Sequence, residues 1–184
     1  IIKFNFKNIK IENKEYFNID ENKNTELITK NQINNSLEEA VKINLITDTK
    51  IGTFLSGGLD SSTITVLAKK YNDQIEGFTT VYRPEKKYEK YNLDFKFSKR
   101  LSEDLDIKLN VNYIDNISSA LDDFYKVTSY LDEPVSNLNL LNTYWQSKHA
   151  NLLNFKVILT GDGSDELFCG YDRYHKIFLS NYLK

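Results

Sequence analysis

Residues 51–62 read IGTFLSGGLDSS, an apolar run that leads directly into a turn rich in glycine and serine. From this stretch onward, short apolar runs alternate with segments whose apolar residues have helical spacing. The expected strands are residues 51–55, 75–82, 107–114 and 155–160, the expected helices are 60–71, 94–105, 117–130 and 139–152, and a polar loop at 83–93 is expected on the ligand side. This alternation is typical of an α/β fold, with a parallel sheet, helices on both faces and right-handed crossovers.

The N-terminal part of the chain shows a different organisation. Residues 1–20 alternate apolar and polar side chains on both sides of Lys7, which predicts a hairpin of two strands. A lone hairpin is barely stable, so we expect it to be the tail of a preceding domain, with residues 21–184 belonging to a second domain. Residues 25–46 have the apolar spacing of an amphipathic helix. The chain contains no methionine and begins with isoleucine, which favours a fragment of a longer protein.

The composition excludes several classes of protein. The 184 residues are 40% hydrophobic and 27% charged, and no run of about 18 apolar residues could span a bilayer. The 24 basic and 26 acidic residues are mixed along the chain, which argues against a nucleic-acid or membrane-surface binder, because such proteins need a concentrated positive field. Cys169 has no partner for an internal disulfide, and no apolar signal segment opens the chain. We therefore expect a folded protein of the reducing cytoplasm, with Cys169 packed as a small hydrophobic residue.

The turn after the first expected strand has the properties of a phosphate cradle. In open α/β sheets ligands bind beyond the carboxyl ends of the strands, where this turn lies. Glycines let the backbone approach an anion, the following helix supplies free N–H groups, and hydroxyls add donors. The residues concerned are Ser56, Gly57, Gly58, Ser61 and Ser62. Asp60 would repel a phosphate unless it binds Mg²⁺, and the lysine of a Walker P-loop is absent, so the cradle suits pyrophosphate as a leaving group.

A second, acidic turn follows the last expected strand. Residues 160–166 read TGDGSDE, and Asp162, Asp165 and Glu166 would repel one another strongly unless a divalent cation binds them or one accepts a proton. Because both turns lie at carboxyl ends of strands, we expect them to converge on one site. The alternative for each motif is structural, namely a glycine-rich turn followed by a helix whose first turn is capped by polar side chains.

Three motifs together resemble a known family. SGGLDSS at 56–62, Asp132-Glu133-Pro134 and TGDGSDELFCGY at 160–171 are similar to the synthetase domain of glutamine-hydrolysing asparagine synthetases, which are ATP pyrophosphatases of the PP-loop class. The resemblance covers about residues 40–175, and residues 1–20 look like the end of the glutaminase domain that precedes it in that family. It implies a fold of the adenine nucleotide α-hydrolase type and a truncated synthetase domain, because the family's catalytic lysine lies beyond the end of this chain.

The same resemblance implies roles for individual residues. It places ATP against Leu55, Ser56, Gly57, Gly58, Asp60, Ser61, Ser62, Thr80, Thr160, Gly161 and Tyr171. Leu55 and Thr80 would lie near the adenine and ribose. Asp60 and Asp165 would hold Mg²⁺, and Asp162 takes the place of the acidic residue implicated in the amidation step.

The activity implied by the resemblance is ATP-dependent amide formation. A carboxylate, aspartate in this family, attacks the α-phosphorus of ATP, pyrophosphate leaves, and ammonia then displaces AMP to give asparagine. The ammonia would come from glutamine, hydrolysed by a glutaminase domain that this chain does not include. The resemblance also allows a homodimer, and we expect the fragment alone to be inactive.

The sequence leaves the identity of the acceptor open, because it departs from the family pattern. Asp162 stands where the family often has glutamate, Cys169 replaces a usual glycine, and in residues 135–148 only Thr143 and Tyr144 are retained. A related enzyme that forms another amide, such as a β-lactam synthetase or a lasso-peptide cyclase, is therefore the first alternative. A nucleotide-binding module without turnover is the second.

Overall fold

The computed structural model describes residues 2–5, 7, 10–13, 27–82, 92–115, 118, 120–133, 135, 137 and 139–182. The chain divides into two units, Ile1–Asn35 and Ser36–Lys184. The first unit contains an antiparallel hairpin of β1 (Ile2–Asn5) and β2 (Lys10–Asn13), in which Ile2 pairs with Asn13. The two strands of the expected hairpin are confirmed, whereas its assignment to a preceding domain stays a prediction.

Helix α1 spans Lys30–Asn44, inside the predicted range of 25–46. It begins directly after Thr29, whose hydroxyl accepts a hydrogen bond from the Gln32 N–H at 3.3 Å, while the Thr29 N–H donates to Gln32 Oε1 at 2.8 Å. This reciprocal pair is a capping box, which gives partners to N–H groups at the start of the helix. Further along, Val41 is buried, so this part of α1 belongs to the core of the second unit.

Four parallel strands form the sheet of the second unit, namely β3 (Ile51–Phe54), β4 (Glu76–Tyr82), β5 (Leu109–Ile114) and β6 (Val157–Leu159). Their order is β5-β4-β3-β6, and Ile51 of β3 lies opposite Val157 of β6. Each strand coincides with an expected strand; β3, β4 and β5 are shorter than expected by one or two residues at one end, and β6 is shorter by two residues at its start and one at its end. The chain winds from β3 outward to β5 and then returns to the other side of β3, so the direction of winding reverses between β3 and β6. In open α/β sheets, ligands bind at such a switch point, beyond the carboxyl ends of the strands.

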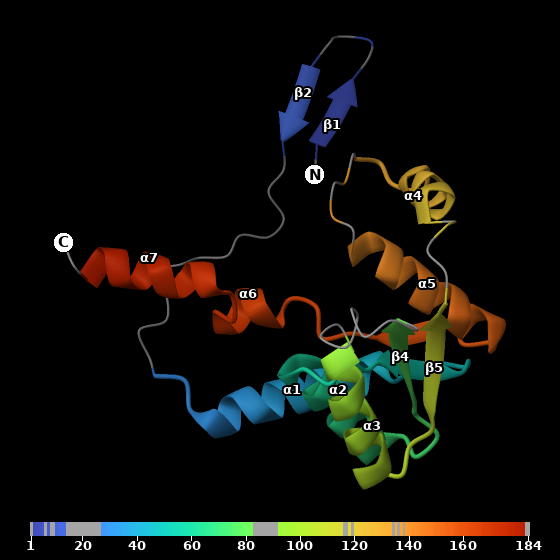
Figure 1. Ribbon diagram of the computed structural model, residues 1–184. Coiled ribbons are helices and arrows are strands. Elements are labelled where there is room, and N and C mark those ends of the chain that lie inside the picture. Colours follow the sequence, from blue (N-terminus) through green and yellow to red (C-terminus); the bar gives the residue numbers. More distant parts are fainter. Residues whose placement is uncertain are drawn as a thin grey trace. The chain divides into compact units, whose positions relative to one another are not determined.

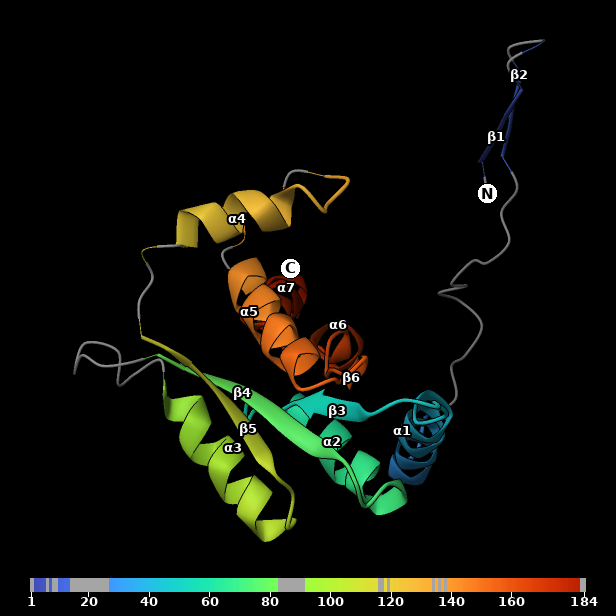
Figure 2. The same cartoon turned by 90° about the vertical axis from the view of Figure 1, so that its right-hand side faces the viewer.

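Helices cover both faces of this sheet, as Figure 1 and Figure 2 show. The helices that follow α1 along the chain are α2 (Leu59–Tyr71), α3 (Leu93–Asp104), α4 (Ala120–Thr128), α5 (Asn139–Leu152), α6 (Ser164–Phe168) and α7 (Asp172–Tyr182). On one face, α1, α2 and α3 bury an apolar cluster that includes Leu55 and Ala68. On the other face, Ala150 of α5 packs with Phe78 and Phe155. The expected α/β architecture, a parallel sheet between helices, is therefore confirmed.

The predicted helices at 60–71, 94–105, 117–130 and 139–152 correspond to α2, α3, α4 and α5. The polar loop expected at 83–93 falls mostly on residues outside the described ranges, as does Pro134. None of the helices that the structure describes is long and apolar enough to cross a membrane.

Candidate active site

A pocket of about 370 Å³ lies at the switch point, beyond the carboxyl ends of β3 and β6. The turn after β3, the turn after β6 and helix α5 each contribute one part of its wall. From the predicted site residues, the pocket brings together Ser56, Asp60, Ser61, Thr160, Gly161, Asp162, Asp165 and Tyr171. The remaining lining residues are Phe54, Asn142, Thr143, Gln146, Gly163 and Glu166.

The turn between β3 and α2 is shaped by glycine and serine. Gly57 has a φ of +86°, and a Cβ at this position would lie 2.7 Å from the carbonyl oxygen of Asp94, so only glycine fits against α3. The hydroxyl oxygens of Ser56 and Ser61 are 2.9 Å apart, and Ser56 Oγ accepts a hydrogen bond from the Gly58 N–H at 3.3 Å. Because Gly58 is the N-cap residue of α2, no capping side chain competes for the first N–H groups of the helix. Those N–H groups and the two hydroxyls form a set of donors suited to an anion.

The turn after β6 contacts the turn between β3 and α2 through Gly161. A Cβ at Gly161 would lie 2.8 Å from Asp60 Cβ and 2.9 Å from the backbone nitrogen of Ser61, so the two turns are in close backbone contact. Gly163 is the N-cap residue of α6. Its φ of +90° is a positive backbone angle that glycine adopts readily because it has no Cβ. The expected convergence of the two turns is therefore observed in the structure.

Carboxylates dominate the charge of the pocket. Asp60, Asp162, Asp165 and Glu166 all line it, and none of its described lining residues is lysine, arginine or histidine. Across the described part of the chain, no group of three or more His, Cys, Asp or Glu side chains is arranged to hold a metal ion by itself. Mg²⁺ that binds together with ATP needs only one or two carboxylates, because phosphates and water supply the other ligands. Asp60, which follows β3, and Asp165, which follows β6, fit that requirement.

Tyr171 lies on the pocket wall just after α6. Its hydroxyl donates a hydrogen bond of 2.9 Å to Glu166 Oε1, and this hydrogen bond is the main reason that the pKa of the Tyr171 phenol is raised. The guanidinium of Arg173 lies 4.4 Å from the centre of the Tyr171 ring, a cation–π contact. These two contacts orient the ring at the edge of the pocket. Sequence reasoning did not find Arg173, which lies two positions beyond the acidic motif.

Helix α5 supplies a wall that sequence reasoning missed, apart from its mention of Thr143. Asn142, Thr143 and Gln146 line the pocket from successive turns of the helix. The Thr143 hydroxyl donates to the carbonyl oxygen of Asn139 at 3.3 Å, whereas the Oδ1 atom of Asn142 is buried and receives no hydrogen bond from any described residue. Asn142 and Gln146 have i, i+4 spacing, which places them on one face of a helix. The sequence does not show that this face of α5 meets the strand ends, so the spacing alone did not identify them as pocket residues.

Some expected residues do not line the pocket. Leu55 is 0% exposed within the core beneath α1, α2 and α3, and it is not among the residues that line the pocket. Gly57, Gly58 and Ser62 shape the turn without lining the pocket. Thr80 of β4 also lies outside it, and its Oγ1 atom is buried with no hydrogen-bond partner among the described residues. The contacts of Leu55 and Thr80 with adenine and ribose therefore stay predictions.

The expectation that Cys169 packs as a small hydrophobic residue is wrong. Cys169 is exposed and follows the last residue of α6 with a φ of 58°, in the left-handed region. Helices commonly end with a residue in this conformation, and glycine adopts it without strain because it has no Cβ. The position therefore has a backbone role at the end of a short helix rather than a place in the core.

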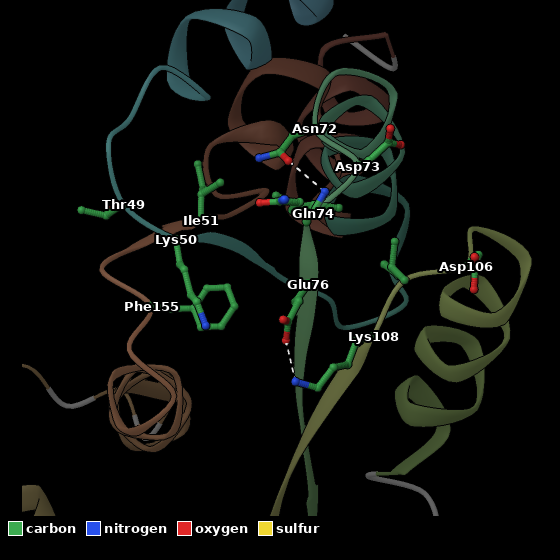
Figure 3. A pocket seen from close by; sticks show the side chains of 12 residues that line it. Thr49, Lys50, Ile51, Asn72, Asp73, Gln74, Glu76, Asp106, Lys108 and Phe155 are labelled. Atoms are coloured by element: carbon green, nitrogen blue, oxygen red, sulfur yellow. Dashed lines mark hydrogen bonds and ion pairs between the residues drawn. The ribbon is translucent and has the colours of Figure 1, made fainter.

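A second cavity, of about 390 Å³, lies at the opposite, amino-terminal ends of the strands. Figure 3 shows Lys50, Glu76, Lys108 and Phe155 around it. Glu76 pairs with Lys108 Nζ at 3.1 Å, and Lys50 Nζ lies 5.5 Å from the centre of the Phe155 ring, so these charges already have partners. We place the candidate site in the first pocket, because the two motif turns meet there and the switch point is where such sheets bind ligands.

A parallel sheet whose switch point carries a glycine- and serine-rich turn beside an acidic turn places the chain among open α/β proteins, which bind ligands beyond the carboxyl ends of their strands. Comparison with known proteins then gives the family. The sequence profile of asparagine synthase matches residues 32–183, and the chain belongs to this family.

Relatives within the family are much longer than the chain. The glutamine-hydrolysing asparagine synthetase B of Escherichia coli (strain K12) is 29% identical over 160 residues, which cover 80% of this chain and 28% of that protein. The glutamine-hydrolysing asparagine synthetase 1 of Bacillus subtilis (strain 168) is 26% identical over 145 residues, which cover 79% of this chain and 22% of that protein. The chain therefore spans less than a third of the length of these relatives.

Among solved structures, an NMN synthetase from Francisella tularensis superimposes with a TM-score of 0.48 and 18% sequence identity. The superposition covers 78% of this chain and 59% of the other. A likeness of this size adds nothing to the assignment, which rests on the sequence profile.

Proposed function

We propose that this chain is the ATP-binding part of a glutamine-dependent synthetase that converts aspartate to asparagine. One observation carries the proposal: the turn after β3 and the turn after β6 meet at Gly161, and both line a single pocket. Membership of the asparagine synthase family supports ATP-dependent amide formation as the chemistry of that pocket. Aspartate and glutamine enter by analogy with the relatives, whose names give asparagine synthesis and glutamine hydrolysis.

In the first step, a carboxylate oxygen of aspartate attacks the α-phosphorus of ATP, and pyrophosphate leaves as the acyl-adenylate forms. The hydroxyls of Ser56 and Ser61 and the first N–H groups of α2 would hold the leaving pyrophosphate. Asp60 and Asp165 would hold Mg²⁺, which neutralises phosphate charge when bound. The protein then contributes mainly positioning and charge neutralisation, as in phosphoryl transfer.

In the second step, ammonia attacks the carbonyl carbon of the adenylate, and AMP leaves. The attacking nitrogen has to lose a proton, and Asp162 lines the pocket as a group that would accept one. Tyr171, held by Glu166, would close this side of the pocket against water. In this proposal the ammonia comes from a glutaminase domain, and the protein works in the cytoplasm.

Exchange of labelled pyrophosphate into ATP, measured with the full-length protein, tests the proposal. Adenylation is reversible while ammonia is withheld, so an acid that serves as substrate drives exchange. We expect L-aspartate to give the fastest exchange in a panel of amino acids, other small acids and short peptides, and added glutamine to yield asparagine.

Two outcomes would contradict this proposal. Exchange with a peptide or another small acid, but none with aspartate, would assign the protein to the enzymes that form other amides, such as β-lactam synthetases and lasso-peptide cyclases. Binding of ATP without exchange for any acid would identify a nucleotide-binding module.

A further inference from the structure

One polar group on the pocket wall has no hydrogen-bond partner in the described part of the chain. Asn142 lies near the start of α5 and lines the pocket, and its Oδ1 atom is buried with no hydrogen bond from the described residues. Buried carbonyl oxygens in folded proteins are nearly always paired, so an unpaired one points to a ligand or an ordered water. The terminal torsion of asparagine is broad, and a modest rotation therefore turns this oxygen toward the pocket at little cost.

The surroundings of Asn142 define which chemistry would satisfy it. An amide oxygen accepts hydrogen bonds and does not donate them, so a hydrogen-bond donor would satisfy it. The lining residues that the structure describes include four carboxylates, those of Asp60, Asp162, Asp165 and Glu166, and no cationic side chain. Asp60 and Asp165 are assigned to Mg²⁺, which leaves the carboxylates of Asp162 and Glu166. Coulombic attraction to these two favours a donor that also carries positive charge, and a protonated amine meets both conditions.

We propose that Asn142 recognises the amino group of the acid that is adenylated, with Oδ1 accepting a hydrogen bond from the protonated amine. This inference rests on the proposed function, and it narrows the acceptor to acids that carry an amine. Asn142 belongs to α5, whereas the groups assigned to the phosphates and to Mg²⁺ belong to the turns after β3 and β6 and to the helices that begin there. The acceptor thus binds between these walls, with its amine toward α5 and its reacting carboxylate toward ATP.

A comparison of two acids isolates the contribution of the amino group to recognition of the acceptor. L-aspartate and succinate share a four-carbon dicarboxylate chain and differ only in the amino group. In the full-length protein, kcat/KM for pyrophosphate exchange is measured with each acid, and KM for ATP is measured alongside. We expect the wild-type protein to prefer aspartate.

Substitutions of Asn142 identify the atom responsible. Asn142→Leu removes the oxygen at nearly constant size, and it should lower kcat/KM for aspartate by about 10- to 100-fold, the loss typical of a hydrogen bond to a charged group, while kcat/KM for succinate is unaffected. Asn142→Asp keeps an oxygen acceptor and should retain the preference for aspartate. Asn151→Leu is the matched control, because it makes the same replacement at an exposed position of α5 outside the pocket and should leave both rates unchanged.

Several results would overturn the inference. An equal fall in kcat/KM with both acids in Asn142→Leu would show that Asn142 has a structural role. A raised KM for ATP with an unchanged preference between the acids would place Asn142 against the nucleotide. A wild-type preference for an acid without an amino group would overturn the inference while the proposed adenylation stands. Exchange with no acid at all would overturn the proposed function and the inference with it.

Discussion

Replacing Gly161 with alanine perturbs the contact on which the candidate site depends. The new Cβ would lie 2.8 Å from Asp60 Cβ and 2.9 Å from both the Asp60 carbonyl carbon and the Ser61 nitrogen. Nonbonded carbon atoms are most favourable at about 3.5–4.0 Å, so the turn after β6 has to move away from α2 by about 0.7 Å. Two of the three contacts are with backbone atoms, and rotation of a side chain cannot relieve them. Overpacking of this kind costs about 1–3 kcal/mol of unfolding free energy.

The same shift moves Asp165 away from Asp60, its assigned partner in holding Mg²⁺, and away from the groups assigned to the phosphates. A misplacement of 1 Å lowers catalytic rates by about 100-fold, so we expect Gly161→Ala to slow pyrophosphate exchange by about 10- to 100-fold and to weaken ATP binding. Chemical denaturation measures the unfolding free energy, and calorimetry measures the affinity for ATP.

Gly163→Ala is the matched control for this experiment. Its φ of +90° strains an alanine, but no atom of the described residues lies within 4 Å of the new Cβ, so this variant loses stability without pushing the two turns apart. Wild-type stability and ATP affinity in Gly161→Ala would refute the contact between the turns. An equal loss of affinity in both variants would show that strain within the second turn, rather than separation of the turns, controls binding.

Three further predictions concern single side chains. Asp60→Asn should weaken ATP binding when Mg²⁺ is present and not when it is absent, because the carboxylate acts through the metal. Calorimetry with and without Mg²⁺ tests this, and an equal loss of affinity in both conditions would contradict the metal role. Ser56→Ala should weaken inhibition by pyrophosphate more than inhibition by AMP, since the Ser56 hydroxyl is assigned to the leaving group. Steady-state inhibition constants for the two ligands test this prediction, and equal effects on both would place the phosphate cradle elsewhere. The pKa of Tyr171 lies above the ordinary value of about 10 because Glu166 accepts its proton in a hydrogen bond, so this contact is intact below about pH 10 and is lost as the pH rises through the raised pKa. In an NMR titration, the midpoint of the Tyr171 ring should fall toward the ordinary value in Glu166→Gln, and a midpoint that does not move would exclude Glu166 as the cause.

Local sequence patterns predicted the elements of the fold, but not the order of the strands. Apolar periodicity depends on neighbouring residues, so it located β3 to β6 and α2 to α5. Strand order depends on pairing between distant segments, which periodicity does not encode. The start of α1 was predicted too early because Leu27 and Ile28 continue the helical spacing, yet they are 95% and 67% exposed and lie outside the helix. The local signal that sets the boundary was the capping box of Thr29 and Gln32.

The candidate site was predictable to the extent that its residues form short motifs. Phosphate and Mg²⁺ binding demand glycine, serine and aspartate within a single turn, so the turns after β3 and β6 stood out in the sequence. Asn142 and Gln146 did not, because neutral residues on a helix become a pocket wall only through the packing of α5 on the sheet. The family resemblance placed Leu55 near the adenine and ribose, but its side chain shares with Ile51 the side of the sheet that is buried against α1, α2 and α3.

The pairing of β3 with β6 also connects the site to the way the chain folds. Ile51 and Val157 lie opposite each other, so the two motif turns come together only when segments more than a hundred positions apart have paired. Such long-range pairing forms slowly, because the entropy of closing the intervening loop has to be overcome first. A nucleotide that needs both turns binds only those molecules in which the pairing is complete, and by mass action it raises their share of the population. In the proposed function, ATP would therefore act as a folding ligand as well as a substrate, and chains synthesised in its presence would reach the native sheet in higher yield.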